Sequence, residues 1–314
     1  MSYLTGHMNL DSGAFFSIYR PTAVIRVVGE DTLPFLQGQF TQELRFPAGA
    51  LCAYGLWLNQ KGKVVADSFA LRDGESWWLV SFTSPAQLIR ERLEAYIIAD
   101  DVVLEDVTGS WGGAVVAGKE STAWFQSKGI VLPPPGEWAS VEGGMIFRGR
   151  RGTGEWWEWL SPEGVGGPKK LRDAGLKECD TADLERWRIL AGIPEIPKDV
   201  GLGDLPNEAG LEEIAVSYSK GCYLGQEVMA RLKSMGRVRR QLLGVRGTES
   251  PPSCPAALYT GGKKVGELRS AVMGREEKTF VGLAMVSLLG LDMAQPLSLD
   301  MNGLPTIEVI RPPS

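Results

Sequence analysis

The alternation of hydrophobic and polar positions predicts a strand followed by a helix near the start of the chain. Val24–Val28 is a β-branched run that is typical of a strand. Asp31 can cap a helix whose hydrophobic positions run in steps of four from Leu36 to Leu44. A strand and a helix packed on it therefore open the predicted fold.

The next segment predicts a hairpin, a strand and a second helix. Hydrophobic runs at 51–58 and 64–71 flank Asn-Gln-Lys-Gly, a turn whose glycine tolerates a positive φ. A further strand is expected at 77–82. Ser84 and Pro85 supply a cap and a first-turn proline for a helix with leucine and isoleucine at helical spacing.

The rest of the chain is predicted to be rich in strands. Short strands are expected at 102–107, 113–117, 145–147 and 156–160, followed by a helix that starts at Thr181 and an extended loop at 193–211. Beyond Gly236, short apolar runs at 241–245, 264–268, 279–286 and 306–310 are separated by glycine and proline. This spacing suggests a small β-barrel or sandwich, and the whole pattern indicates the α+β class.

Composition limits the possible functions. The 314 residues suggest two or three domains, and 33 Lys and Arg against 38 Asp and Glu give a net charge of −5, which argues against general attraction to nucleic acid. No apolar run reaches membrane-spanning length, and the first nineteen residues hold no lysine or arginine to start a signal peptide. We therefore expect a cytoplasmic protein with no membrane contact.

Cysteine and histidine usage narrows the chemistry further. Cys52, Cys179, Cys222 and Cys254 form no CxxC pair, so they are expected to be reduced thiols without a metal site. His7 is the only histidine. Ser-His-Asp triads, Cys-His nucleophiles and multi-histidine metal sites are thereby excluded.

The densest chemical signal is the segment 220–227, which reads Lys-Gly-Cys-Tyr-Leu-Gly-Gln-Glu. Its two glycines leave Cys222 without bulky neighbours, and the Lys220 ammonium could stabilise a thiolate if it folds back toward the sulfur. A reactive thiol is one interpretation. A buried cysteine on a turn is equally compatible with the residues alone.

This segment resembles the YgfZ family of folate-binding proteins, which are related to the aminomethyltransferase (T-protein) of the glycine cleavage system. Members share Lys-Gly-Cys-Tyr-x-Gly-Gln-Glu, and the chain supplies all seven fixed positions. Residues 28–41 are similar to the family's N-terminal block, and 188–194 resemble its Arg-Ile-x-x-Gly-x-Pro block. The similarity extends over nearly the whole chain, although the C-terminal part matches in texture only.

The resemblance implies a three-lobed T-protein-like fold, with two mixed α/β lobes around a central channel and a small C-terminal β-barrel. The expected lobes are 1–50 with 178–238, a ferredoxin-like lobe at 51–177, and the barrel at 239–314. Tetrahydrofolate or a derivative would sit in the channel.

Family members support the assembly or repair of iron–sulfur proteins, including radical enzymes that modify transfer RNA. That role is thought to depend on the motif cysteine, here Cys222, and we group Lys220 with it as a catalytic candidate. Tyr223 and Gln226 of the same motif are candidate folate contacts. A single thiol cannot hold a cluster that takes four ligands, so iron–sulfur client proteins are the expected partners.

Two further folate contacts are implied by the T-protein. Glu158, in a tryptophan-rich segment, is a candidate pterin anchor, because a carboxylate can accept two hydrogen bonds from a pterin edge. Arg188 matches the arginine near the glutamate tail of folate. The alternatives are an exposed strand carboxylate for Glu158 and an ion pair on a helix surface for Arg188.

Asp67 falls where the T-protein carries an Asp-Asp pair that includes its catalytic acid, and Ala66 replaces the other member. Folate binding can survive this change even if aminomethyl transfer is lost. Whether the missing carboxylate is the catalytic one is open. The alternative for Asp67 is a strand residue close to a turn.

Two other patterns have simpler explanations. A basic stretch could touch RNA phosphates, but alternating cations on a strand usually form a solvated face; it comprises Arg231, Lys233, Arg237, Arg239 and Arg240. The tryptophans at 77–78 and 156–159 could stack on a flat ligand, but such residues more often pack in a core.

Three functions stay open at this point. The preferred one is a tetrahydrofolate-binding accessory factor for iron–sulfur proteins. The others are a tetrahydrofolate-dependent aminomethyltransferase or demethylase, and a non-catalytic scaffold with a degenerate folate pocket.

Overall fold

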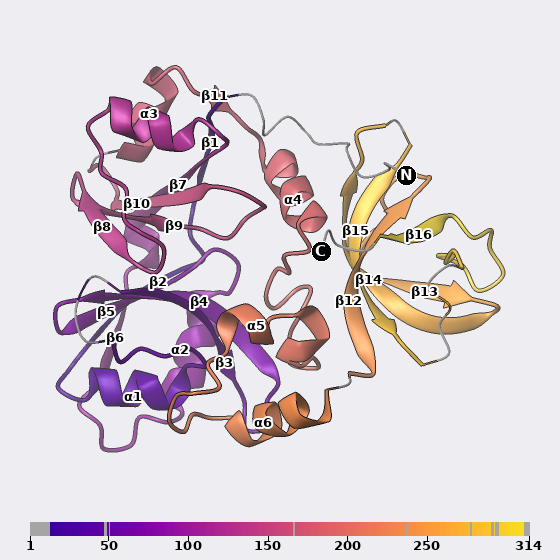
Figure 1. The fold of residues 1–314 in the computed structure, drawn as a ribbon, viewed down its shortest axis with the longest axis horizontal. Helices are drawn as coiled ribbons and strands as arrows, with labels where there is room; N and C mark the ends of the chain where they lie inside the picture. Colours follow the sequence, from indigo (N-terminus) through magenta and orange to yellow (C-terminus); the bar gives the residue numbers. More distant parts are fainter. Residues whose placement is uncertain are drawn as a thin grey trace.

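The structure is built from three β-sheets with helices between and around them (Figure 1). It is a computed structural model that describes residues 13–46, 49, 51–165, 167–236, 238–276, 278–289, 292 and 295–310. His7 and Arg237 lie outside the described residues. Among the described residues, no helix has the length and apolar character needed to cross a bilayer.

The first sheet has the strand order β3-β4-β5-β2-β6, and all its neighbours are antiparallel. Helices α1 and α2 pack on one face, where Leu36 and Ile89 join the same core. The elements are β2 (Ala23–Val28), α1 (Thr32–Gln39), β3 (Cys52–Leu58), β4 (Val64–Asp73), β5 (Ser76–Ser81), α2 (Ala86–Glu94) and β6 (Val103–Asp106).

The predicted hairpin is confirmed, with β3 and β4 paired around a turn in which Gly62 has φ 68°. The first helix is shorter than its hydrophobic spacing predicted. It ends at Gln39, because Phe40 adopts an extended conformation. The Phe40 side chain is fully buried, but it lies beyond the end of the helix. Asp31 precedes the helix but makes no side-chain cap; its carboxylate accepts the backbone N–H of Asp101 instead.

The second sheet has the order β11-β1-β7-β10-β9-β8 and packs against the uncovered face of the first. Its elements are β1 (Phe15–Tyr19), η1 (Thr108–Ser110), β7 (Trp111–Ala117), α3 (Ser121–Ser127), β8 (Trp138–Val141), β9 (Gly144–Arg148), β10 (Trp156–Pro162), η2 (Gly167–Asp173) and β11 (Lys177–Glu178). The apolar layer between the sheets joins Val24 and Phe69 to Phe147 and Leu160. Residues of the two sheets therefore pack together in one apolar layer.

The sheets divide the chain differently from the expected first two lobes. The expected boundary at 50/51 cuts through the first sheet, since β2 is paired with β5. Strand β1 instead belongs to the second sheet, where it pairs with β7. Motif spacing carries no information on these pairings, because strand partners are chosen by packing between distant segments.

The third sheet lies at the right of Figure 1 and has the order β13-β14-β15-β12-β16. Its strands are β12 (Arg240–Gly247), β13 (Ala256–Thr260), β14 (Lys263–Met273), β15 (Phe280–Ser287) and β16 (Ile307–Ile310). The edge strands are linked through the segment 297–298, which bridges to Tyr259 on one side and to Ile307 on the other. These bridges curl the sheet into the small barrel that the sequence predicted.

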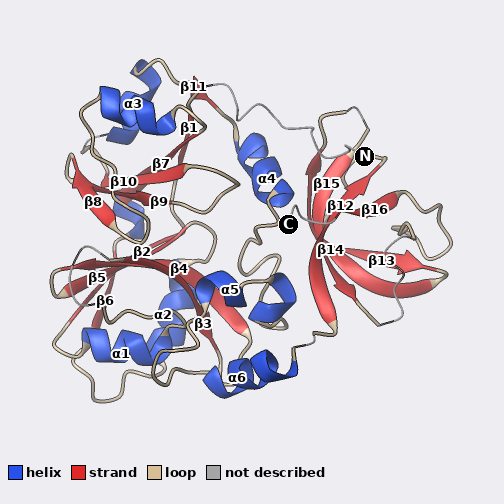
Figure 2. Cartoon of the chain, in the orientation of Figure 1, coloured by secondary structure: helices blue, strands red, loops and turns tan. Residues whose placement is uncertain are grey.

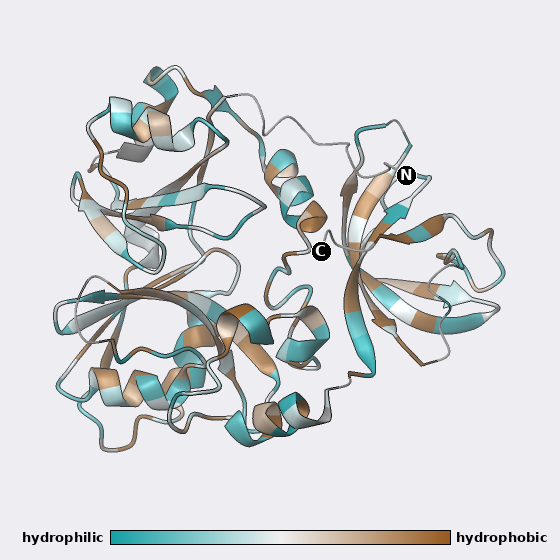
Figure 3. Ribbon diagram, in the orientation of Figure 1, coloured by the Kyte–Doolittle hydropathy of each residue, from teal (hydrophilic) through white to brown (hydrophobic). Residues whose placement is uncertain are grey.

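The segment between the second sheet and the barrel carries helices joined by loops (Figure 2), namely α4 (Thr181–Leu190), η3 (Pro206–Ala209), α5 (Glu212–Ala215) and α6 (Gln226–Met235). The predicted start of α4 at Thr181 is confirmed, with the Asp180 carboxylate accepting the Asp183 N–H. Helix α6 was missed by the sequence reasoning. It carries Arg231 and Lys233, so these cations lie on a helix with both hydrophilic and hydrophobic turns (Figure 3), not on a strand.

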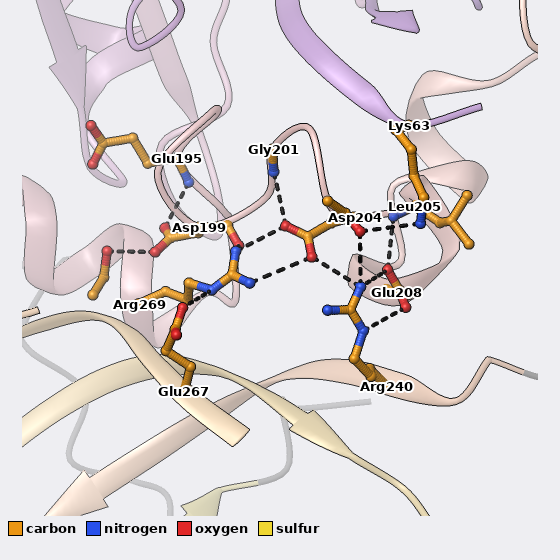
Figure 4. A network of polar contacts seen from close by, with 12 residues as sticks. Lys63, Glu195, Asp199, Gly201, Asp204, Leu205, Glu208, Arg240, Glu267 and Arg269 are labelled. Atoms are coloured by element: carbon orange, nitrogen blue, oxygen red, sulfur yellow. Dashed lines mark hydrogen bonds and ion pairs between the residues drawn. The ribbon is translucent and has the colours of Figure 1, made fainter. Parts of the chain in front are cut away.

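Buried carboxylates join the predicted loop at 193–211 to the barrel (Figure 4). The fully buried Asp199 accepts hydrogen bonds from Arg188 Nη1 of α4 and from Ser270 Oγ of β14, each at 2.6 Å. Asp204 accepts from Arg269 Nη1 at 2.8 Å and from Arg240 Nη2 at 3.1 Å. Ion pairs with α4 on one side and with the barrel on the other therefore hold the loop in place.

We predict that Asp199→Ala lowers the free energy of unfolding by about 3–5 kcal/mol, because a buried guanidinium loses one of its two close carboxylates and the buried Ser270 hydroxyl loses its acceptor. Urea unfolding measures this effect. The control is Arg20→Ala, which removes an exposed ion pair with Glu163 and should cost less than about 1 kcal/mol. Equal losses in the two variants would contradict the assignment.

Candidate functional site

A narrow cavity of about 50 Å³, with polar and apolar side chains in its wall, lies where the first two sheets meet the end of α4. It is lined by Tyr54, Asp67, Ser68, Phe69, Val80, Ser81, Phe82, Thr83, Arg150, Arg151, Arg188, Ile193 and Pro194. Ligand pockets usually measure hundreds of cubic ångströms, and this space holds little more than a few waters. Three of the lining residues, Arg150, Arg151 and Arg188, are arginines.

Asp67 faces this cavity from β4. Its Oδ1 accepts the hydroxyls of Ser81 (3.0 Å) and Ser84 (2.6 Å), and its Oδ2 accepts the Tyr54 hydroxyl at 2.9 Å. Burial, followed by the charge of Asp67, raises the pKa of Tyr54 well above its usual value. Tyr54 therefore remains a neutral hydrogen-bond donor to Asp67.

The alternation of β4 separates Asp67 from the neighbouring position. Ala66 is fully buried in the core between the sheet and its helices, whereas Asp67 points to the opposite face with Phe69. A carboxylate at position 66 would point away from the cavity. The acid that the chain retains is therefore the one at the cavity wall.

Glu158 lies on β10 behind the cavity wall and has no exposure to solvent. Its Oε2 accepts the Tyr19 hydroxyl at 2.5 Å, and its Oε1 accepts Arg151 Nε at 2.6 Å. The alternative of an exposed strand carboxylate is wrong, because the side chain faces between sheets. Burial, the largest single cause, lowers the pKa of the Arg151 guanidinium, but Glu158 and Tyr19 together, through charge and hydrogen bonds, raise it above its usual value.

Arg188 lines the cavity from α4, but its donors are used inside the protein. They bind Asp199 at 2.6 Å and Glu185 at 2.5 Å, together with Ser270. Burial opposes its charge, and these hydrogen bonds raise its pKa nevertheless. The alternative of an ion pair on a helix surface is also wrong, since the side chain is buried against the barrel.

Cys222 is exposed, so the alternative of a buried cysteine on a turn is wrong, and the reactive thiol stays a prediction. The motif around it is held firmly. Leu224 N–H donates to the carbonyl of Gly38, and Gly225 adopts φ 87° at the start of α6. The thiol therefore lies on a loop fixed to the end of α1.

Lys220 does not serve the thiol as the sequence analysis expected. The side chain is buried, and its Nζ donates to the carbonyl oxygens of Phe40 and Gln42, both at 2.7 Å. Phe40 and Gln42 come just after the C-terminal end of α1 at Gln39. The ammonium supplies the hydrogen-bond donors that their carbonyl oxygens need. Burial lowers the pKa of Lys220 to about 8.

The structure does not bring the motif and the cavity together. Tyr223 is packed in an apolar cluster with Leu56 and Met229, and burial raises its pKa. Gln226 is half-buried at the start of α6. None of the residues 220–227 lines the cavity. The tryptophans at 77–78 and 156–159 do not line it either, and most are core residues.

Four residues of the site were missed by sequence reasoning, namely Tyr19, Tyr54, Arg150 and Arg151. Arg150 packs over the Tyr54 ring at 4.9 Å. The only local signal was the pair of arginines between glycines at 149–152, which typifies a loop. In the described part of the chain, no group of three or more potential ligand side chains could hold a metal ion.

Known proteins resemble this chain in sequence and in fold. The family model for the GCVT N-terminal domain matches residues 20–128. The human iron-sulfur cluster assembly factor IBA57, mitochondrial, is 29% identical over 289 residues, covering 82% of this chain and 76% of the human protein. The tRNA-modifying protein YgfZ of Edwardsiella ictaluri is 26% identical over 239 residues, covering 71% and 68%.

Among solved structures, the glycine cleavage system aminomethyltransferase T of Bartonella henselae has a TM-score of 0.79 at 16% identity. The match covers 96% of this chain and 87% of that protein. Two packed sheets beside a narrow cavity, joined to a barrel, thus form the fold of this aminomethyltransferase. The similarities to the GCVT N-terminal domain, IBA57 and YgfZ support a YgfZ-type family related to that enzyme.

We predict that Lys220→Met lowers the free energy of unfolding by about 1–3 kcal/mol, because two buried carbonyls lose their donor. Chemical denaturation at pH 7 measures the change. Lys61→Met, at an exposed turn position, is the control and should have little effect. An unchanged stability in Lys220→Met would contradict the role given to the ammonium.

The lowered pKa of Lys220 adds a pH dependence to this difference. The folded state holds the proton less tightly than the unfolded chain, whose lysine has the ordinary pKa of 10.5. The stability of the wild type relative to Lys220→Met should therefore rise as the pH increases from about 8 to 10.5. A falling or flat difference over this range would contradict the assigned burial of the charge.

Proposed function

We propose that this protein is a tetrahydrofolate-binding accessory factor for the assembly or repair of iron–sulfur proteins, acting through the Cys222 thiol. The observation that carries the proposal is the position of Cys222 on a loop with buried anchors on both sides. Lys220 and Tyr223 are each about 6% exposed, whereas the cysteine between them is open to solvent. Such a thiol is accessible and fixed in position.

The other three cysteines differ from Cys222 in environment. Cys179 is buried and Cys52 and Cys254 are partly buried. Burial raises the pKa of all three, to about 11 for Cys179. They stay protonated near neutral pH, and thiolate chemistry at these sites is disfavoured.

The names of the relatives support a role in iron–sulfur metabolism. IBA57 is named as an iron-sulfur cluster assembly factor, and YgfZ as a tRNA-modifying protein. Both descriptions fit the expected clients, which are iron–sulfur proteins and include radical enzymes acting on transfer RNA. A cytoplasmic location stays a prediction, and for the basic stretch a solvated face stays preferred over contact with RNA.

We predict that Cys222→Ser abolishes the contribution of this protein to iron–sulfur enzyme activity in cells while leaving its unfolding free energy unchanged, because the side chain is exposed. Complementation of a deletion strain, with aconitase-type and tRNA-thiomethylation activities as readouts, measures this. Cys52→Ala serves as the control thiol. Full activity of Cys222→Ser would refute the proposal.

The folate part of the proposal rests on the cavity wall. Asp67 and Arg188 line the cavity, and Glu158 lies behind its wall, bound to the lining residue Arg151. In the proposal the carboxylates bind a pterin edge and the guanidinium exchanges a protein partner for a carboxylate tail. Titration with tetrahydrofolate under anaerobic conditions, followed by tryptophan fluorescence and calorimetry, should give saturable binding that Glu158→Gln weakens about tenfold or more. A flat titration would favour a scaffold with a degenerate pocket.

Because Asp67 faces the cavity, a second candidate function is that of a tetrahydrofolate-dependent aminomethyltransferase or demethylase. The retained acid is the cavity-facing one and has a tyrosine and two serines around it. The purified protein should then form methylenetetrahydrofolate from tetrahydrofolate and an aminomethyl donor, and Asp67→Asn should lose this activity. Absence of product above background would reject this function.

A further inference from the structure

Arg151 is bound to the carboxylate of Glu158, the group to which the proposed function assigns the pterin. Two of its N–H groups point to the two oxygens of Glu158, with Nε 2.6 Å from Oε1 and Nη2 3.3 Å from Oε2. The guanidinium carbon lies 4.1 Å from the centre of the Tyr19 ring and 4.2 Å from that of Phe82. A planar cation with two adjacent donors is thus held between a carboxylate and two aromatic rings.

A pterin offers the same features to a protein. Its N3–H and 2-amino group are adjacent donors on one planar edge, and together with N1 they form a guanidine-like unit within the ring. A carboxylate accepts this edge as it accepts an arginine fork, and aromatic side chains cover its faces. Arg151 and a pterin edge therefore satisfy Glu158 in the same way.

We propose that Arg151 is the specificity-determining residue of the folate site, holding Glu158 until a planar ligand with two adjacent N–H donors displaces it. The inference rests on the proposed function, because it names what the site selects. It also accounts for the small size of the cavity. With Arg151 in place only about 50 Å³ is open, which cannot admit a bicyclic ring.

The local sequence lets this guanidinium lie close to Glu158. Arg151 lies in the connection between β9 and β10, and a side chain at Gly149 would meet Glu158, with its Cβ 2.5 Å from Oε1. Glycine at 149 therefore lets the carboxylate and the loop approach closely. Arg150 differs from its neighbour, since it packs over Tyr54 and donates to the Tyr54 hydroxyl.

Displacement makes the site discriminate between related ring systems. Pterin can replace both donors of Arg151. Lumazine, which carries an oxygen in place of the 2-amino group, presents a single N–H between two carbonyls at that edge. It would leave Glu158 with an unsatisfied oxygen, and buried polar groups without partners are costly. We expect the free protein to bind pterin at least tenfold more tightly than lumazine.

The test uses the unmodified protein first. Phenylglyoxal labelling, with the sites assigned by mass spectrometry, should modify Arg151 slowly in the free protein and several-fold faster in the presence of saturating tetrahydrofolate. Lumazine should leave the rate unchanged, and Arg150 reports on general opening of the loop. Saturable tetrahydrofolate binding with no change at Arg151 would overturn the inference while leaving the proposed function intact.

Variants provide the second measurement. Arg151→Ala should bind pterin about tenfold more tightly than the wild type, because the internal competitor is gone. It should also gain thermal stability from added methylguanidinium, which fills the vacated position. The matched control Arg148→Ala, at an exposed position of β9 outside the cavity lining, should show neither effect.

The outcomes separate the two claims. Wild-type binding with no gain in Arg151→Ala, and no methylguanidinium effect in the folded variant, would refute the role of Arg151 alone. Failure of both proteins to bind pterin or tetrahydrofolate would refute the proposed function and, with it, this inference. If Arg151→Ala does not fold, the labelling result decides.

Discussion

Carboxylates buried between the sheets constrain this structure more than any other feature. Glu158 between the first two sheets, and Asp199 and Asp204 beside the barrel, are each almost entirely removed from water. An ionised carboxylate in such a place requires cationic or hydroxyl donors in fixed positions. Because the donors come from different sheets and helices, satisfying each carboxylate also sets how the neighbouring parts pack. Arg151 and Arg188, which pair with Glu158 and Asp199, also line the cavity.

The candidate chemistry is divided between two places. The acid, the tyrosine and the arginines gather at the cavity, whereas the thiol lies on a separate loop next to the end of α1. A folate in the cavity would therefore not touch the sulfur directly in this arrangement. Any coupling between them would pass through the core cluster that contains Tyr223, with Tyr54 packed against it.

Much of the fold could be predicted from the sequence, and less of the site. The β3–β4 hairpin, the start of α4 and the barrel follow from periodicity and turn residues, which act locally. The pairing of β1 with β7 and the end of α1 at Gln39 depend on distant packing. Glu158 could be named from a motif, but its pairing with Arg151 required the three-dimensional proximity of a loop.

The firm mounting of Cys222 has a kinetic consequence. A sulfur on a swinging arm can visit several positions, but this one is anchored through Leu224 to Gly38 and through Lys220 to the chain after α1. It behaves as a stationary target. In the proposed role, turnover at this atom would depend on collision with another molecule, and its rate should scale with the concentration of that molecule until an encounter complex saturates.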